Sequence, residues 1–471
     1  MRRRTLRLVL VLSVAAGLAA PAGLAAERMW VGFHDDPSFR WVSDRATRIE
    51  SSAREGATVM RLLVHWNQTV PRRPTQGTDP FDPAYNLNDL DEAIRTAQRS
   101  DMEVVLTLVG TPRWANGGQG PNVMPKRISD FGAFTQALAS RYSGRFDGYP
   151  FVRFWTVWNE PNLQLFLKPQ FDSRGRSVAP RNYARLFAAG YRGIKAGNPR
   201  ALVAMGETSA RGTDNPKGVR PVHSPGRFVE ELAKANPRLR FDAWSHHPYP
   251  FTPNLRPSQK VRWPNVTLGS LPTLEAKLKT LFNRTSVPIW VTEYGHETKP
   301  QDAFGISYAK QSAYLKQSIA IARSYPFVTM FVWFVYQDDP GQPWDSGLYT
   351  QAGDAKGSSP PRFSAAAKPL DARNTVLALR RGTPTPLVTL YTRRFCVVDE
   401  PGTNISIDWR VTVGGRVVES NHQTASLRAN CTIDVRMSGF TVAGRRTYLA
   451  TFELHDIHGT KLTRRLTLRG V

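Results

Sequence analysis

The stretch FWTVWNEPN, residues 154–162, joins alternating large apolar residues to the polar tetrapeptide Asn-Glu-Pro-Asn. An apolar run that alternates with period two predicts a buried β-strand, here over residues 152–158. Pro161 has no amide hydrogen to donate to a neighbouring strand, so it marks the end of this one. Glu160 therefore lies where a buried strand ends and a loop begins. One carboxylate there does not indicate a function by itself, so the residues at the ends of the other predicted strands decide whether Glu160 has a functional role.

Seven similar segments accompany this strand. The short apolar runs lie about 43 residues apart, with amphipathic helical patterns between them, at residues 29–33, 58–64, 103–109, 152–158, 201–206, 241–247, 288–293 and 328–336. Eight strands alternating with helices predict an α/β fold, a closed (β/α)8 TIM barrel over residues 27–380. An open doubly wound sheet is the alternative, but it needs a glycine-rich phosphate-binding turn, and none follows VGFHDD (31–36).

The N-terminus has the pattern of a secretory signal peptide over residues 1–26. Four arginines precede the apolar run LVLVLSVAAGLAA (8–20), and small residues follow around Ala22 and Ala26. That run is short for a membrane span, and no other apolar stretch of 18 residues occurs. We expect a secreted, extracellular protein without a membrane segment after cleavage; an uncleaved anchor is the alternative.

The pattern changes after residue 375. Five short β-rich runs separated by turn signals fill residues 384–471 and predict an immunoglobulin-like β-sandwich, joined to the barrel through RGTPTP (381–386). The only two cysteines, Cys396 and Cys431, both lie in this part. In an exported protein such a pair favours a disulfide over a metal site.

The chain is strongly basic, with a formal net charge of +25 over 471 residues. A basic surface can attract an acidic polysaccharide, and compositional bias towards arginine explains the same charge, so both interpretations stay open. No nucleic-acid-binding motif occurs, and no His/Cys cluster has zinc spacing. We expect a carbohydrate partner, no nucleic acid, no metal and no organic cofactor; the oligomeric state is not predicted.

In a barrel, chemistry collects where the strands end and the βα loops begin. Glu160 ends the fourth predicted strand and Glu293, in WVTEYG, ends the seventh. Three steps around an eight-stranded barrel place them on nearly opposite walls of one pocket. Two facing carboxylates suit glycoside hydrolysis, in which one gives a proton to the leaving oxygen and the other attacks the anomeric carbon. The acids at other strand ends, including Glu207, Asp338 and Asp339, are predicted to form a polar rim.

WNEPN and WVTEYG together resemble the retaining glycoside hydrolases of clan A, which include families 5 and 39. The resemblance covers residues 28–375 and implies that Glu160 is the general acid/base and Glu293 the nucleophile. Upstream of WNEPN, Arg153 and Thr156 replace a Trp and a Glu of the family 39 pattern. The choice between the families therefore stays open.

The same resemblance implies further roles in binding the substrate. Asn159 would bind the sugar 2-hydroxyl, and Arg61 would keep the nucleophile ionised, as a neighbouring cation does. His247 and Tyr249 match the clan's strand-six His-x-Tyr, and Trp333 matches its strand-eight tryptophan, which forms the floor of the sugar site. Aromatic rings at a barrel mouth also stack on sugars, which adds Trp114 as a candidate.

The resulting prediction is a retaining O-glycosyl hydrolase that cleaves a poly- or oligosaccharide. A transglycosylase using the same two carboxylates is one alternative, and a non-catalytic carbohydrate-binding barrel is the other. The sequence pattern does not predict which sugar is bound, which linkage is cleaved, or whether cleavage occurs within a chain (endo) or at its end (exo).

Overall fold

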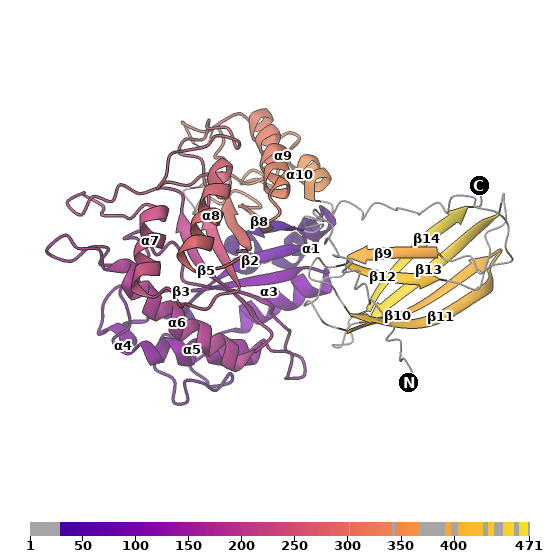
Figure 1. The fold of residues 1–471 in the computed structure, drawn as a ribbon, viewed down its shortest axis with the longest axis horizontal. Helices are drawn as coiled ribbons and strands as arrows, with labels where there is room; N and C mark the ends of the chain where they lie inside the picture. The colour runs from indigo at the N-terminus through magenta and orange to yellow at the C-terminus, as the bar shows by residue number, and fades with distance from the viewer. Residues whose placement is uncertain are drawn as a thin grey trace, which may run out of the picture.

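The computed structural model describes residues 29–300, 302–341, 344–367, 391–396, 404–426, 432–437, 446–455 and 461–469. Figure 1 shows a barrel surrounded by helices and, beyond it, a set of yellow strands from the C-terminal part. The predicted signal peptide and the RGTPTP join lie outside the described residues. None of the described helices is long and apolar enough to cross a membrane.

Eight parallel strands close into a barrel in sequence order, with β1 paired to β8, which confirms the predicted fold. The strands are β1 (Trp30–His34), β2 (Val59–His65), β3 (Glu103–Val109), β4 (Phe154–Val157), β5 (Leu202–Ser209), β6 (Ala243–His247), β7 (Ile289–Tyr294) and β8 (Val328–Phe334). Their bounds differ from the predicted ones by a few residues at the ends.

Helices follow the strands and cover the outside of the barrel (Figure 1). They are α1 (Arg45–Arg54), α2 (Trp66–Thr69), α3 (Asn88–Arg99), α4 (Arg113–Asn116), α5 (Ile128–Arg141), α6 (Ala179–Gly197), α7 (Pro225–Ala235), α8 (Leu271–Leu281), α9 (Tyr308–Ser324) and α10 (Ser359–Ala367). A π-helical turn, η1 (Pro37–Trp41), and a 3-10 turn, η2 (Leu268–Ser270), lie in the connections.

Two separate apolar layers hold the barrel together, because successive side chains of a strand point to opposite faces. A small cluster from alternate strand positions includes Val59, Val105, Phe154, Met330 and Val332. A much larger cluster packs the other face of the strands against the helices. The position of a residue in this alternation therefore decides whether its side chain can reach the barrel mouth.

The C-terminal strands form two antiparallel sheets. The four-stranded sheet has the order β11 (Arg416–Ser426), β10 (Asn404–Val413), β13 (Thr447–His455), β14 (Lys461–Arg469), and the two-stranded sheet pairs β12 (Thr432–Met437) with β9 (Tyr391–Cys396). Apolar residues of β10, β12 and β13 share one buried cluster. The two sheets therefore pack face to face, and the predicted sandwich is confirmed.

The predicted disulfide stays a prediction, because Cys431 lies outside the described residues. Cys396 is the last residue of β9 and pairs in register with Thr432, which follows Cys431 directly in sequence.

Candidate active site

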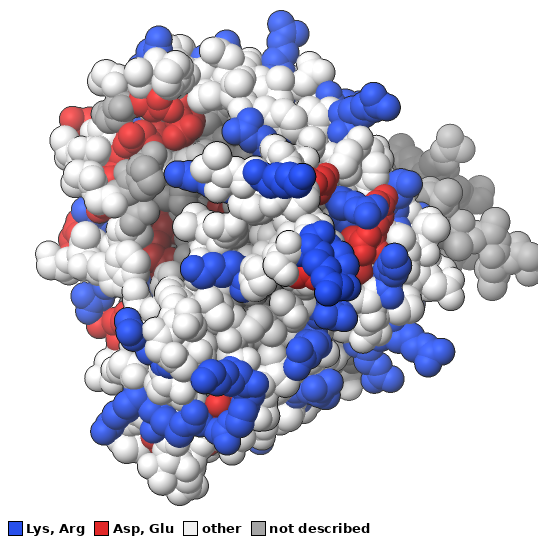
Figure 2. All heavy atoms as spheres, turned by 90° about the vertical axis from the view of Figure 1, so that its left-hand side faces the viewer, with Lys and Arg blue, Asp and Glu red and all other residues white. Residues whose placement is uncertain are grey.

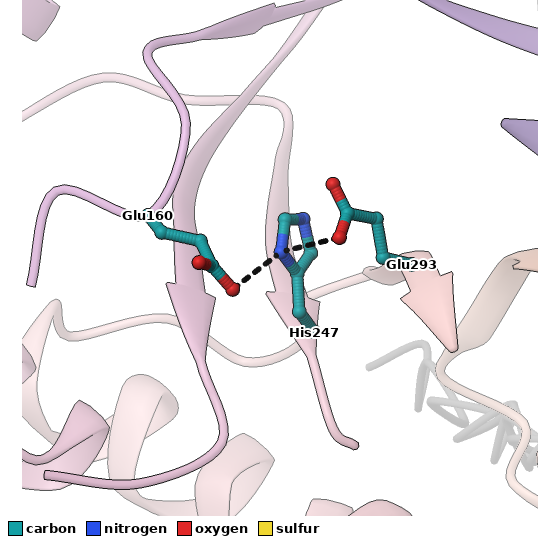
Figure 3. A group of neighbouring side chains, drawn as sticks. All are labelled: Glu160, His247 and Glu293. Atoms are coloured by element: carbon teal, nitrogen blue, oxygen red, sulfur yellow. Dashed lines mark hydrogen bonds and ion pairs between the residues drawn. The ribbon is translucent and has the colours of Figure 1, made fainter. Parts of the chain in front are cut away.

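Glu160 and Glu293 meet at the C-terminal end of the barrel. After β4 the backbone turns through two residues with positive φ, Trp158 (72°) and Glu160 (36°), where the strand ends and the Glu160 carboxyl group contacts His247. Glu293 comes from the end of β7, and His247 from the end of β6 lies between the two glutamates (Figure 3). One oxygen of each carboxyl group and one nitrogen of His247 lie within 4.8 Å of one another.

Glu293 is held by hydrogen-bond donors and cations. Arg61 Nη1 donates to its Oε1 at 2.7 Å, and Tyr249 Oη donates to its Oε2 at 3.0 Å. Nδ1 of His247 is 3.5 Å from Oε2, and Nδ1 of His34 is 3.4 Å from Oε1. Burial alone would raise the pKa of Glu293, but the charges of His247 and Arg61 outweigh burial and hold this pKa far below its usual range. The carboxylate of Glu293 therefore stays ionised well into the acidic pH range, and two hydrogen-bond donors fix its orientation.

The pKa of Glu160 is shifted in the opposite direction. Burial raises its pKa, and the negative charge of Glu293 adds to that effect, although the hydrogen bond from His247 opposes it. His247 Nδ1 lies 3.0 Å from Glu160 Oε1. The two carboxyl groups of the site thus differ in acidity, and Glu160 keeps its proton to higher pH than Glu293 does.

Arg61 connects the predicted site residues below the two carboxyl groups. It lies in the middle of β2, is fully buried, and donates from Nη2 to Asn159 Oδ1 at 2.8 Å as well as to Glu293 from Nη1. Its Nε donates to Thr107 Oγ1 at 2.9 Å. The guanidinium group therefore orients both the Glu293 carboxylate and the Asn159 amide, whose remaining NH2 group is of a type that can donate to a sugar hydroxyl.

Glu207 is not the rim residue that was predicted, because its side chain is fully buried beneath the pair. Its Oε2 accepts from Arg61 Nη2 at 2.6 Å and lies 3.1 Å from His247 Nε2. Its Oε1 accepts from the hydroxyl groups of Ser245 (2.7 Å) and Thr292 (3.1 Å). Burial opposes its charge, but Arg61 and His247 outweigh burial and lower the pKa of Glu207 to about 2.

The acids after β8 also lie away from the pair. Asp338 is buried in an ion pair with Lys356 at 2.5 Å and accepts from the backbone of Gly347. Asp339 caps a turn by accepting from Gly341 N at 2.7 Å. Both stabilise the loop that follows β8.

His34 at the end of β1 belongs to the site and was missed by the sequence analysis. It contacts Arg61 through Nδ1, and its Nε2 lies 3.2 Å from Asp36 Oδ2. Asp36 in turn binds Arg40 at 2.9 Å. The signal that could have found this chain of contacts is the run of polar residues His34-Asp35-Asp36 at the end of a predicted strand.

Trp333 does not form the floor of the sugar site, which corrects the prediction. It is fully buried in the cluster between barrel and helices, and its Nε1 donates to Ser346 O at 2.8 Å. The next residue, Phe334, faces the mouth and is partly exposed; its ring lies 5.0 Å from that of His34 and 6.4 Å from that of Tyr249. Trp344 from the following loop lies 5.0 Å from Tyr249, so Phe334 and Trp344 supply the aromatic surface beside Glu293.

Trp114 is partly buried in α4, after β3, and its contacts lead away from the pair. Its Nε1 donates to Val70 O at 2.8 Å, and the Arg73 guanidinium lies 4.5 Å from the centre of its ring. Trp66 packs edge-on against it at 5.6 Å. The described contacts of Trp114 do not include Glu160 or Glu293, and a role for it in substrate binding stays a prediction.

The model of one protein family, described as cellulase (glycosyl hydrolase family 5), matches residues 25–337. That match covers more than half of the chain. The chain belongs to glycosyl hydrolase family 5. This settles the choice between families 5 and 39, and the protein is a glycoside hydrolase of clan A.

Solved structures with the same fold include members of two glycoside hydrolase families. A family 39 glycoside hydrolase from Bacteroides cellulosilyticus WH2 is 18% identical, with a TM-score of 0.55 over 85% of this chain and 80% of that one. A GH5_18 protein from Streptomyces cattleya, in complex with GlcNAc, is 16% identical, with a TM-score of 0.52 over 73% of this chain and 80% of that one. At these identities the likeness shows the fold alone.

One curated relative matches a shorter segment. The galactolipid galactosyltransferase SFR2, chloroplastic, of Arabidopsis thaliana is 26% identical over 139 residues, 28% of this chain and 21% of that protein. The match thus spans about a fifth of the relative's length.

The donor set of this family 5 site suits a sugar better than a cation. Glu160, His247 and Glu293 are close enough together to surround a metal ion. Burial opposes a charge on His247, but Glu293, Glu160 and Glu207 outweigh burial and raise its pKa to about 10. An imidazolium has no lone pair to give to a metal, and a metal ligand must be deprotonated.

Proposed function

We propose that this protein is a retaining glycoside hydrolase in which Glu293 is the nucleophile and Glu160 the general acid/base. The observation that carries the proposal is the pair itself: two carboxyl groups whose oxygens lie within 4.8 Å, with pKa values shifted in opposite directions. A separation of about 5–5.5 Å belongs to the retaining geometry, and wider separations to inversion.

In the first step, Glu293 attacks the anomeric carbon while Glu160 gives its proton to the leaving glycosidic oxygen, and a covalent glycosyl-enzyme forms. Arg61 and Tyr249 hold the attacking carboxylate in one orientation, because each donates to a different oxygen of it. Once Glu293 is esterified its negative charge is gone, so Glu160 loses its proton more readily. In the second step, Glu160 therefore acts as a base, takes a proton from water, and the water releases the sugar.

The substrate class is a carbohydrate, and the sugar is a matter for experiment. The fold neighbour from Streptomyces cattleya was solved with GlcNAc and with Manb1-4GlcNAc, which makes these sugars reasonable first probes. An acidic polysaccharide is the second class to test, because the chain carries a net charge of +25. Figure 2 shows Lys and Arg side chains spread over much of one face, with Asp and Glu gathered mainly towards one side of it. The signal-like N-terminus supports export to such a substrate.

Transglycosylation by the same residues is the closest alternative, and the transferase among the relatives makes it worth testing. Sugar acceptors would then compete with water for the glycosyl-enzyme, and products longer than the substrate would accumulate. A binding protein without activity is disfavoured because both carboxyl groups and their partners are in place.

The decisive experiment is a screen of the purified protein against aryl glycosides and against neutral and acidic polysaccharides. Glu293→Gln should lose several orders of magnitude in turnover. Glu160→Ala should lose most with poor leaving groups, which need the proton. Asp91→Asn is the matched control, because Asp91 is a buried carboxylate paired with Arg141 at 2.6 Å outside this site.

Proton NMR of the first product gives the stereochemistry of an active substrate. We expect the anomeric configuration of the substrate to be retained. An inverted first product, or near-normal activity of Glu293→Gln, would refute the assignment.

A further inference from the structure

Glu207 lies inside the site because of an irregularity in β5. The pairing of β5 with β6 shifts register between Gly206 and Thr208, so Glu207 is the extra residue of a bulge. Both bulge residues have positive φ, 112° for Gly206 and 50° for Glu207. A β-carbon on Gly206 would lie 2.5 Å from the Trp244 ring, and Tyr183 accepts from the Gly206 backbone at 2.9 Å. A bulge aims a side chain in a direction that a regular strand cannot, and a non-glycine residue at positive φ needs its surroundings to hold it there.

Glu207 is the hydrogen-bond acceptor that His247 needs on its inner side. A doubly protonated imidazole donates from both nitrogens and therefore requires two acceptors. Nδ1 of His247 faces Glu160 at 3.0 Å and Glu293 at 3.5 Å, and Nε2 faces Glu207 at 3.1 Å. Without a carboxylate at the Nε2 side, the second proton would have no charged partner in a buried place.

The charges of the buried groups balance only with Glu207 included. The cations are Arg61 and His247, the anions are Glu207 and Glu293, and each of the two cations lies against each of the two anions. The sum is zero when Glu160 carries its proton. Uncharged Ser245 and Thr292 complete the surroundings of Glu207 on the β6 and β7 sides, Tyr183 lies behind the bulge, and His34 and Asp36 lie beyond Arg61 on the β1 side.

We propose that Glu207 is a positioning residue of the reaction, which holds His247 as an imidazolium and balances Arg61, so that Glu293 is ionised while Glu160 keeps its proton. Glu207 touches neither the sugar nor the reacting atoms; it acts through His247 and Arg61. The inference rests on the proposed function, but part of its test does not need activity.

The test variant is Glu207→Gln, which keeps the shape of the side chain and removes its charge. Removing an anion lowers the pKa of every neighbouring group, so both Glu160 and His247 should lose their protons at lower pH. One imidazole ring separates Glu207 from Glu160, and at an effective dielectric constant near 20 the shift should be roughly one pH unit.

Two measurements read this shift. The first is the basic limb of kcat/KM with a 4-nitrophenyl glycoside that the wild-type protein cleaves; it should move to lower pH in Glu207→Gln and stay in place in Glu207→Asp and in the control Asp91→Asn. The second is the nitrogen NMR signal of His247 in protein labelled with 15N-histidine. Because His247 contacts Glu207 directly, its pKa, about 10 in the wild type, should fall by more than that of Glu160, by up to about three units. The signal should therefore report an imidazolium in the wild type at pH 8 and a mainly neutral ring at that pH in Glu207→Gln.

A folded Glu207→Gln variant with an unmoved basic limb and a charged His247 would overturn the proposal and leave Glu207 as barrel packing. If Glu207→Gln does not fold, the wild-type NMR spectrum still decides, because a neutral His247 at pH 7 contradicts the inference directly. Failure of the wild-type protein to cleave any aryl glycoside or polysaccharide would count against the proposed function, whereas the NMR titration would still test Glu207.

Discussion

Arg61 should set the acidic limit of activity, and Arg61→Met tests this. In the structure its guanidinium donates to Glu293 at 2.7 Å and to Glu207 at 2.6 Å, inside a fully buried site. Two unit charges about 4 Å apart interact by about 4 kcal/mol at an effective dielectric constant of 20. One pKa unit corresponds to about 1.4 kcal/mol, so loss of the cation can raise the pKa of Glu293 by up to about three units. His247 and Tyr249 still contact Glu293 in the variant, which makes this an upper value.

The assay is the pH dependence of kcat/KM with an activated aryl glycoside, whose leaving group needs no proton. Protonation of Glu293 then causes the acidic limb, and this limb should move to higher pH in Arg61→Met. Arg61→Lys should shift it less, because lysine keeps the charge but cannot contact Glu293, Glu207 and Asn159 together. An acidic limb that coincides with that of the wild type, in a folded and active Arg61→Met variant, would refute the reasoning.

The thermal stability of Arg61→Met should depend on pH, because Arg61 pairs with the carboxylates of Glu293 and Glu207. Glu293 and Glu207 have folded pKa values below their unfolded values, so their contribution to stability is present above the unfolded pKa, near 4.3, and is lost as the pH falls through the folded pKa. Without Arg61 these folded values rise, and the stabilisation is missing at neutral pH. The melting temperature of Arg61→Met should therefore lie below that of the wild type at pH 7, and the gap should narrow only below about pH 4, as the pH falls towards the folded pKa of Glu207, about 2. A gap of constant size would mean that Arg61 stabilises the barrel through packing alone.

Three further predictions concern other parts of the chain. Phe334→Ala should lower kcat/KM by reducing substrate binding, whereas Trp333→Phe should lower the melting temperature and leave KM unchanged; steady-state kinetics with thermal melts distinguish the two, and a raised KM in Trp333→Phe alone would reverse the assignment. Thiol titration of the exported, denatured protein should find no free thiol, since a disulfide between Cys396 and Cys431 would stabilise the small domain by roughly 3–4 kcal/mol in the chain-entropy model; two reactive thiols would exclude it. Residues 27–380 expressed alone should retain activity on the same aryl glycoside, and their complete inactivity in a folded state would give the sandwich a part in the site.

The sequence carried enough information for the barrel and for the pair. Eight similar strand and helix units predict closure, and the end of each strand marks the mouth, so Glu160 and Glu293 could be placed from position alone. Arg61, His247 and Tyr249 followed from the resemblance to clan A, and the structure places all three against the two glutamates. These residues lie on regular strands or directly after them, where the period of two holds.

Trp333 shows where that reasoning stops. Residues 331–336 read FVWFVY, so large apolar side chains occupy both faces of β8 and the alternation does not show which face is which. A shift of one residue moves every side chain to the opposite face of a strand. Phe334 could therefore be distinguished from Trp333 only by the register of β8 against β1, in which His34 pairs with Phe334.

The prediction that Glu207 lies at the polar rim was wrong for a different reason, and its buried position bears on the charge balance of the site. A glutamate after Gly206 at a strand end looks like a rim residue, because nothing in the sequence indicates the bulge that turns it inwards. Burying a third carboxylate is costly unless it is paired, and here Arg61 and His247 pair with it on one side while two hydroxyl groups do so on the other. Those same two cations face Glu293, and only His247 donates to Glu160. Glu293 thus receives more positive charge than Glu160 from a network that is neutral as a whole, and this asymmetry shifts the pKa values of two glutamates of the same intrinsic acidity in opposite directions, as the proposed mechanism requires.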